Sequence, residues 1–477
     1  MLSPFITIKD LKKQIKNKEI SIADIKTFYE ERIKKYNPTL NVLVRAFSEK
    51  MPTPTHDGKL AGIPCLVKDN LCVKNVVTSA GSKILKNFVP CYSATVVENI
   101  RGQGGLILGH ANMDEFAMGS SGEFSAYGPS KNPWNLNYAP GGSSSGIAAA
   151  VAAGLVPWGL GSETGGSVRQ PAAFCGLVGL YPTYGLLSRY GLIAFASSTD
   201  QPGPITRTVY DCAIALSVLA GHDSKDATSL PEPKIDYTKK LDGKLPKGLK
   251  IGIIRDSFND GVDAEIRTAT ENAVRTLEGM GATVRMIDLP SLKHGIAVYF
   301  IISRAEAASN LARIDGTLQG ARAEEFANLG DMYLQTRELG FGPEVKRRIL
   351  LGNYVLSSEH RDVYNQANFV RSLIRTELET AFDEVDVLLS PTTSTLPFAL
   401  NGVINDPLAL YMADYFTVPN CVAGYPALSV PAGMAKSNLP IGVQFIGNRL
   451  CEELLLAVGY AFEQSSGYCN LKAKGWD

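Results

Sequence analysis

The sequence has 477 residues, of which 45% are hydrophobic and 20% are charged, and its 47 Lys and Arg residues balance its 47 Asp and Glu residues. These values exclude a largely disordered chain, because disordered chains combine low hydrophobicity with high net charge. The neutral balance also excludes a general attraction to a polyanion, so any nucleic acid is expected to meet a local patch or a partner protein.

The apolar runs and the cysteines indicate the environment in which the protein works. The longest apolar run, residues 147–160, is interrupted by Gly154, Pro157 and Gly159, whereas a membrane span needs roughly 18 uninterrupted apolar residues. The eight cysteines form no C-x-x-C pair and are expected to be reduced, buried thiols. We therefore expect a soluble protein of the cytoplasm, or of an organelle matrix if the source is eukaryotic, with no membrane partner.

The spacing of apolar residues predicts alternating helices and strands. A first helix follows Ser21, which is a suitable N-cap, and contains "IADIKTFYEERIKKY". Strands are predicted over 62–69, 105–109, 249–256, 282–289, 385–391 and 441–447. Further helices are predicted over 94–102, 144–154, 208–221, 263–280, 342–382 and 452–464. This alternation is typical of the α/β class with one large mixed sheet, and residues 223–248 are predicted to form a long surface connection.

Three polar islands lie in otherwise apolar, Gly-rich surroundings: "VKDN" (67–70), "GGSSSG" (141–146) and "GSETGGSVRQP" (161–171). In the third island Gly165 and Gly166 precede Ser167, and the missing Cβ atoms let backbone N–H groups turn inward. Such donors stabilise the oxyanion of an acyl-transfer intermediate, and losing one costs about 3–4 kcal/mol of barrier. The third island is therefore predicted to hold a nucleophilic serine.

A serine nucleophile needs a base, and Lys68 is the preferred candidate. It follows the apolar strand "GIPCLV", where burial lowers the pKa of a lysine and lets the neutral amine accept a proton. Two alternatives stay open: an ordinary salt bridge between Lys68 and Asp69, and a distant histidine as the base. None of the five histidines lies in the islands: His56, His110, His222, His294 and His360.

The "GGSSSG" island also allows a different interpretation, a phosphate cradle. Backbone N–H groups at the start of a helix bind anions. The Gly-rich phosphate loops that use this geometry continue with G-K-[ST], and no such sequence follows here. A catalytic role is therefore favoured.

Together the islands resemble the amidase signature family, whose catalytic unit is Ser–cis-Ser–Lys. Lys68 and Ser143 are 75 residues apart, and Ser143 and Ser167 are 24 residues apart, as in that family. The resemblance implies that Ser167 is the nucleophile, Ser143 the bridging serine with a cis peptide bond, and Lys68 the terminal base. It also implies that the oxyanion hole is formed by the N–H groups of Thr164, Gly165, Gly166 and Ser167.

The same resemblance implies a fold. It predicts an α/β protein with the amidase signature fold, in which one large mixed β-sheet is covered by helices on both faces. Residues 1–477 would form a single domain, with a helical N-terminal region of about 1–60, a signature core of about 61–222 and a C-terminal α/β region of about 249–477. Ser144 is expected to support its loop by hydrogen bonding.

Several longer stretches resemble one branch of this family, the A subunits of tRNA-dependent amidotransferases. They include "GHANMDEFAMGSS" (109–121), "AEAASNLARIDG" (305–316) and "GFGPEVKRRILLG" (340–352). The resemblance implies a glutaminase that passes ammonia to a partner, which amidates misacylated Glu-tRNA(Gln) or Asp-tRNA(Asn). Subunits B and C would be the partners, with tRNA bound mainly through them. ATP and Mg would be used by the partner, and no metal or cofactor is expected in this chain.

The branch also implies a pocket for glutamine. Arg348 would bind the α-carboxylate, Asp414 would bind the α-ammonium, and Tyr299 would line the pocket; an Arg fork suits a carboxylate geometrically. Alternatively these charges lie on solvated helix faces, and the choice between Arg347 and Arg348 stays open.

Three positions depart from the pattern of the family or branch. Ser145 stands where the family usually has Gly, and Tyr181 and Leu186 stand where the A subunits commonly have Lys and Arg. The alternative function is a stand-alone amide hydrolase of the same family that acts on small amides. A scaffold protein without activity is disfavoured, because all three catalytic positions are intact.

Overall fold

Eleven strands form one mixed sheet in the computed structural model, which describes residues 2–47, 58–402 and 406–477. In sheet order the strands are β1 (Leu43–Ala46), β3 (Leu106–Ala111), β2 (Pro64–Lys68), β4 (Trp158–Glu163), β6 (Gln201–Thr206), β5 (Val178–Tyr181), β10 (Ala427–Met434), β11 (Pro440–Gly447), β9 (Val387–Pro391), β7 (Lys250–Ile254) and β8 (Thr283–Ile287). Strand β2 is parallel to β3 and β4, and β7 is parallel to β8 and β9, whereas the other pairs are antiparallel. The predicted mixed sheet is confirmed.

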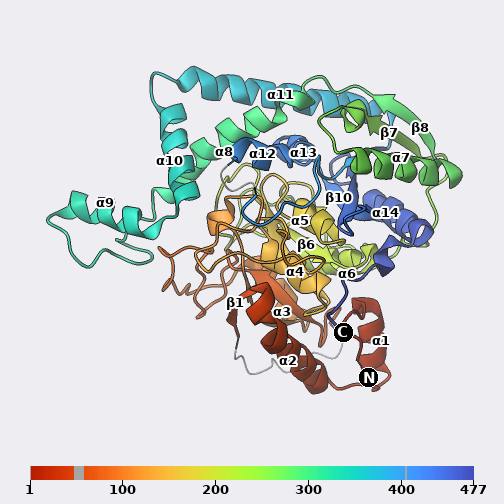
Figure 1. The fold of residues 1–477 in the computed structure, drawn as a ribbon, viewed down its shortest axis with the longest axis horizontal. Helices are drawn as coiled ribbons and strands as arrows, with labels where there is room; N and C mark the ends of the chain where they lie inside the picture. The colour runs from red at the N-terminus through yellow and green to blue at the C-terminus, as the bar shows by residue number, and fades with distance from the viewer. Residues whose placement is uncertain (1, 48–57, 403–405) are drawn as a thin grey trace.

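Helices cover both faces of this sheet (Figure 1). They are α1 (Ile8–Lys16), α2 (Ile22–Leu40), α3 (Thr95–Gly102), α4 (Ser145–Ala152), α5 (Arg169–Phe174), α6 (Val209–Leu219), α7 (Ala264–Gly279), α8 (Gly295–Leu311), α9 (Leu329–Gly340), α10 (Pro343–Leu356), α11 (Arg361–Glu384), α12 (Pro407–Met412), α13 (Val418–Ala423) and α14 (Glu452–Ser466). Alternation along β9 separates two cores: Val387 and Leu389 pack with α7 and α14, and Leu388 packs with α8, α11 and α13. The predicted two-sided cover is confirmed.

The ends of several elements follow the sequence pattern closely. The Ser21 side chain accepts a hydrogen bond from the Asp24 N–H and caps α2, as predicted. The predicted helix over 342–382 is wrong as one element, because it divides into α10 and α11. Ser357 ends α10 in an extended conformation, with φ −63° and ψ 153°, and its hydroxyl bonds the His360 ring at 3.0 Å. Neither Gly nor Pro occurs between residues 357 and 360 to mark this break.

Strands β1, β4, β5, β6 and β10 were not predicted from the sequence. The buried strands β4, β5, β6 and β10 contain no more than two consecutive apolar residues. The equally buried β2, β3 and β9, which were predicted, each contain three. Prolines and a glycine interrupt β6, whose sequence is QPGPIT. Residues 223–248 contain no helix or strand, as expected for a long connection.

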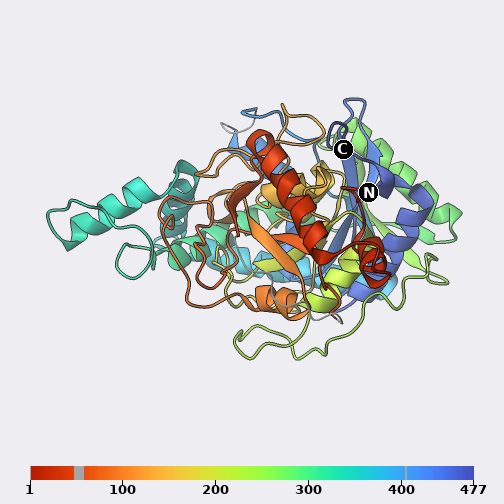
Figure 2. The same ribbon diagram turned by 90° about the horizontal axis from the view of Figure 1, so that it is seen from below.

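Helix α9 projects from the body of the molecule in both ribbon views (Figures 1 and 2). Only Met332 and Thr336 of this helix are buried. Helix α10 connects α9 to the body and packs mainly against α8. Within the described ranges, no helix combines the length and apolar character that crossing a membrane requires.

Candidate active site

The three polar islands meet where strand β2 ends. Lys68 is the last residue of β2 and is fully buried. Its Nζ atom donates hydrogen bonds to Ser143 Oγ at 2.8 Å and to the Ser162 carbonyl at 2.9 Å. The Ser144 N–H bonds the Ser167 carbonyl at 3.2 Å, so the loops that carry the two predicted catalytic serines lie against each other.

The surroundings of Lys68 favour a neutral amine. Burial lowers the pKa of Lys68 to about 7, although nearby carboxyl groups act in the opposite direction. Those groups are Asp114, Asp200 and Glu163. Asp69 accepts hydrogen bonds from Ser79 and from the Gly81 N–H instead of pairing with Lys68. Among the described residues, Lys68 therefore forms no salt bridge with Asp69.

His110 is the histidine nearest in sequence to the GGSSSG loop, but both of its ring nitrogens lie beside backbone carbonyls outside that loop. It is completely buried, and its two ring nitrogens lie 3.1 Å from the Val77 and Leu71 carbonyls. Burial lowers the pKa of His110, and the Asp69 carboxylate lies 3.3 Å from its ring. His56 lies outside the described residues.

The loop from Thr164 to Ser167 requires its glycines. Gly166 has a φ of +139°, and a Cβ there would lie 2.6 Å from Asp414 Oδ1. A Cβ on Gly165 would lie 2.8 Å from the Tyr299 ring. Within the described part of the chain, the N–H groups of Gly165, Gly166 and Ser167 have no hydrogen-bond acceptor. These free donors are what an oxyanion hole needs. The Thr164 hydroxyl bonds Asp200 at 2.7 Å.

A buried ion pair that the sequence did not predict holds both ends of this loop. Glu163 accepts hydrogen bonds from the Val168 and Arg169 N–H groups, each at 3.0 Å, and forms an ion pair with the Arg169 guanidinium. Arg169 also bonds the Thr417 carbonyl at 2.7 Å. The sequence feature that could have predicted this ion pair is the presence of Glu163 and Arg169, six residues apart, within an apolar, Gly-rich island.

The peptide bond between Gly142 and Ser143 is cis. Two N–H groups along this loop already have acceptors: that of Gly142 bonds Gln170 at 3.0 Å, and that of Gly146 bonds the Asn112 carbonyl at 3.0 Å. The loop is therefore unsuited to cradle a phosphate. The Ser144 hydroxyl bonds the Ser162 carbonyl at 3.2 Å, so it supports the loop as expected.

The predicted pocket residues lie beside the Gly165–Gly166 loop. Tyr299 of α8 faces Gly165, and Asp414 faces Gly166. Arg348 of α10 is buried and donates from Nε to Glu344 at 2.7 Å, and Glu344 also accepts from the Tyr411 hydroxyl at 2.8 Å. The Arg347 side chain is 45% exposed, so the structure places Arg348 inside and Arg347 at the surface.

Asp414 has an incomplete set of partners. Its Oδ2 accepts a hydrogen bond from the Ser120 hydroxyl, and its Oδ1 is buried without a hydrogen-bond partner among the described residues. Burial raises the pKa of Asp414 to about 8, although the Ser120 hydrogen bond acts against this. A carboxyl group in this state favours the approach of a cation, which would restore its charge.

A family model described as Amidase matches residues 25–456. The chain belongs to the amidase signature family. It is 48% identical over 473 residues to the A subunit of the glutamyl-tRNA(Gln) amidotransferase of Halothermothrix orenii, with 98% of each protein covered. The crystal structure of the A subunit of the glutamyl-tRNA(Gln) amidotransferase of Thermotoga maritima matches with a TM-score of 0.83 at 38% identity, over 97% of this chain and 95% of that one. A structure of 6-aminohexanoate cyclic dimer hydrolase matches with a TM-score of 0.86 at 25% identity, over 99% of each chain.

The three departures, Ser145 from the family pattern and Tyr181 and Leu186 from the A-subunit pattern, are buried. Tyr181 is fully buried, its hydroxyl bonds the Thr199 carbonyl at 3.0 Å, and its ring lies 5.5 Å from the Arg169 guanidinium. Leu186 is also buried. Ser145 is the buried first residue of α4 and does not take a left-handed conformation. These residues leave the Lys68–Ser143 contact intact.

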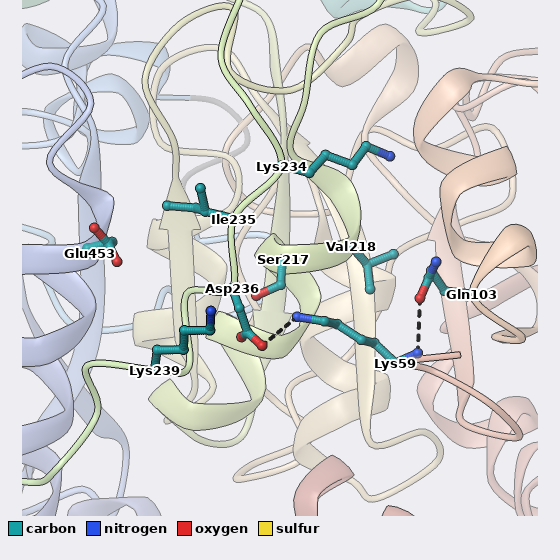
Figure 3. Close-up of a pocket in the computed structure, with 9 residues that line it drawn as sticks. All are labelled: Lys59, Gln103, Ser217, Val218, Lys234, Ile235, Asp236, Lys239 and Glu453. Atoms are coloured by element: carbon teal, nitrogen blue, oxygen red, sulfur yellow. Dashed lines mark hydrogen bonds and ion pairs between the residues drawn. The ribbon is translucent and has the colours of Figure 1, made fainter. Parts of the chain in front are cut away.

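A cavity of about 620 Å³ lies elsewhere on this amidase-family chain (Figure 3). It is lined by Lys59, Gln103, Ser217, Val218, Lys234, Ile235, Asp236, Lys239 and Glu453. Lys59 pairs with Asp236 at 2.8 Å in its wall. Since these residues include none of the predicted site residues, the cavity is separate from the candidate active site.

Proposed function

We propose that this chain is the glutaminase component of a tRNA-dependent amidotransferase. It hydrolyses glutamine to glutamate and ammonia, and a partner protein uses the ammonia to amidate misacylated Glu-tRNA(Gln) or Asp-tRNA(Asn). The observation that carries the catalytic part is the hydrogen bond between buried Lys68 and Ser143. The tRNA-dependent part rests on the similarity to proteins named as A subunits of glutamyl-tRNA(Gln) amidotransferases.

Ser167 is the proposed nucleophile. Its Oγ attacks the side-chain amide carbon of glutamine, while Ser143 takes the Ser167 proton and passes its own to neutral Lys68. The N–H groups of Gly165, Gly166 and Ser167, with that of Thr164, stabilise the oxyanion. The C–N bond then breaks, the relay returns the proton to the leaving ammonia, and an ester of Ser167 remains. Water hydrolyses this ester and releases glutamate.

The glutamine head group is recognised on the other side of the loop. Arg348 binds the α-carboxylate, and the free Oδ1 of Asp414 binds the α-ammonium. Tyr299 stands between these charges and the catalytic loop, because its ring faces Gly165. A glutamine whose α-carboxylate and α-ammonium are bound by Arg348 and Asp414 presents its side-chain amide to Ser167.

Subunits B and C are the proposed partners, and ATP and Mg are used by the partner subunit. Large apolar side chains are exposed on α9 and α10, which favours a protein partner on these helices. They are Leu329, Leu334, Leu339, Leu350, Leu351, Tyr354 and Leu356. Helix α10 also carries Arg348, so a partner docked there is close to the source of ammonia. We place the assembly in the cytoplasm, where charged tRNA is found.

Replacing Ser167 with Ala tests the proposal. Ser167→Ala abolishes ammonia release from glutamine, while the complex with its co-purified partners still amidates tRNA when ammonium salts are added. Ser144→Ala, which changes a supporting hydroxyl in the neighbouring loop, serves as the matched control and keeps glutaminase activity. Ammonia release by Ser167→Ala at the wild-type rate contradicts the nucleophile. Hydrolysis of short-chain amides without hydrolysis of glutamine supports the stand-alone amidase instead.

A further inference from the structure

Arg304 is a buried cation that pairs with no carboxylate among the described residues. It lies on α8, five residues after Tyr299, and is fully buried. Its Nη1 donates to Ser303 Oγ at 2.8 Å. Its Nε and Nη2 have no hydrogen-bond partner among the described residues. The guanidinium lies 3.5 Å from the centre of the Phe300 ring and 5.0 Å from that of Tyr411. Buried guanidinium groups normally pair with a carboxylate or bond fully, so this one needs an explanation.

The charges around the glutamine pocket do not balance. Glu344 forms ion pairs with both Arg347 and Arg348. Burial raises the pKa of Asp414 to about 8, which favours the neutral carboxyl group. In the ranges that the structure describes, Arg304 forms no ion pair, and its strongest charged neighbour is Arg348. Within this cluster, Arg304 therefore carries a positive charge that no ion pair among the described residues compensates.

We propose that Arg304 is a specificity-determining residue that makes this pocket select amides bearing a carboxylate. The proposal rests on the proposed glutaminase function and deepens it. Arg348 contacts the α-carboxylate, but Glu344 already compensates its charge. Arg304 supplies the excess positive charge that the incoming carboxylate neutralises.

A charge at this position acts without touching the substrate. Arg304 lies 5.5 Å from the centre of the Tyr299 ring, and Tyr299 in turn faces the catalytic loop at Gly165. Electrostatic interactions weaken less with distance in a buried, water-poor region than at the surface. Arg304 is thus a positioning residue, and its loss weakens ground-state binding more than it slows the chemical step.

The test compares two substrates that differ only in the carboxylate: glutamine and 4-aminobutanamide, which is glutamine without its α-carboxylate. Arg304→Met is expected to raise KM for glutamine by about tenfold or more, with little change in kcat. The same variant leaves kcat/KM for 4-aminobutanamide unchanged. Arg304→Lys retains the charge and keeps KM for glutamine near the wild-type value.

Phe300→Leu is the matched control, because it removes the ring stacked on Arg304 and keeps the charge. It is expected to leave KM for glutamine unchanged. If Arg304→Met does not fold, Arg304→Gln replaces it in the same comparison, with thermal unfolding measured for each variant. The proposal is overturned if the neutral variants keep the wild-type KM for glutamine, or if kcat/KM falls equally for glutamine and 4-aminobutanamide. It is also overturned if Phe300→Leu raises KM for glutamine as much as Arg304→Met does. Failure of the wild-type complex to hydrolyse glutamine would instead overturn the proposed function.

Discussion

The catalytic loops and the segment from α8 to α10 are built in opposite ways. Every residue from 141 to 183 is buried, and this region contains its own ion pair between Glu163 and Arg169. In the segment from α8 to α10, Nε and Nη2 of Arg304 have no hydrogen-bond partner among the described residues. The same segment carries strongly exposed leucines, such as Leu334, whose exposed fraction is 72%. The first region is buried throughout and held by an internal ion pair, whereas the second presents exposed apolar side chains beside a buried guanidinium.

This difference separates two tasks. Bond making requires fixed geometry, and fixed geometry comes from side chains that are locked by packing and hydrogen bonds. Recognition requires groups left free until the ligand arrives, such as Asp414 Oδ1. Substitutions in the first region should therefore change kcat, whereas substitutions in the second should change KM or partner binding.

The largest effect is expected at Lys68. Lys68→Met removes the proposed base, so kcat for glutamine is expected to fall by about 10²–10⁴-fold, which is the usual contribution of general base catalysis. Lys68→Arg does not restore activity, because a guanidinium is not deprotonated in proteins. Steady-state kinetics with glutamine measures both variants.

The pH profile of the wild-type protein checks the same assignment. The neutral amine is the active form, and burial lowers the pKa of Lys68 to about 7. Activity is therefore lost as pH falls through about 7 and reaches a plateau above it. A kcat that stays constant between about pH 5 and about pH 8 would show that Lys68 is not the base.

A smaller effect, on KM, is expected at Arg348. Arg348→Met raises KM for glutamine by about 10–100-fold, since it removes a charge-assisted contact to the carboxylate. Arg347→Met is the matched control one position earlier in α10, and it leaves KM unchanged because its side chain is 45% exposed. Breaking the buried pair with Glu344 also costs about 3–5 kcal/mol of stability, so kinetics are measured well below the unfolding midpoint. A larger rise for Arg347→Met contradicts the placement.

The same division explains what sequence reasoning found and missed. The positions of Lys68, Ser143 and Ser167 were predicted because their motifs are local and their spacing resembles that of a known family. Arg304 was missed because its significance lies in a missing partner, and no sequence pattern records which carboxylate fails to reach a guanidinium. The choice between Arg347 and Arg348 likewise depends on how α10 packs against α8, which adjacent identical residues do not encode.

The strands show a similar limit. Buried strands are recognised by continuous apolar runs, as in β2, β3 and β9, but Gly, Pro or polar residues break these runs in β4, β5, β6 and β10. Their residues are brought together by long-range pairing, as where β10 joins β5 through Leu428 and Leu180. Because such pairing joins residues far apart in the sequence, a local pattern does not reveal it.

The smallest effect is expected at Ser145, the departure from the family pattern inside the most constrained region. Its hydroxyl lies 3.4 Å from Ser130 Oγ, a long contact, so Ser145→Ala is expected to change the free energy of unfolding by less than about 1 kcal/mol and to leave kcat unchanged. Gly142→Ala in the same loop is the contrast, because its Cβ would lie 2.1 Å from Asp114 Oδ2. Chemical denaturation and glutaminase assays compare the two variants. Equal losses of stability and activity in the two variants would mean that tight packing alone determines how this loop responds to substitution, and that the specific contacts of each residue do not.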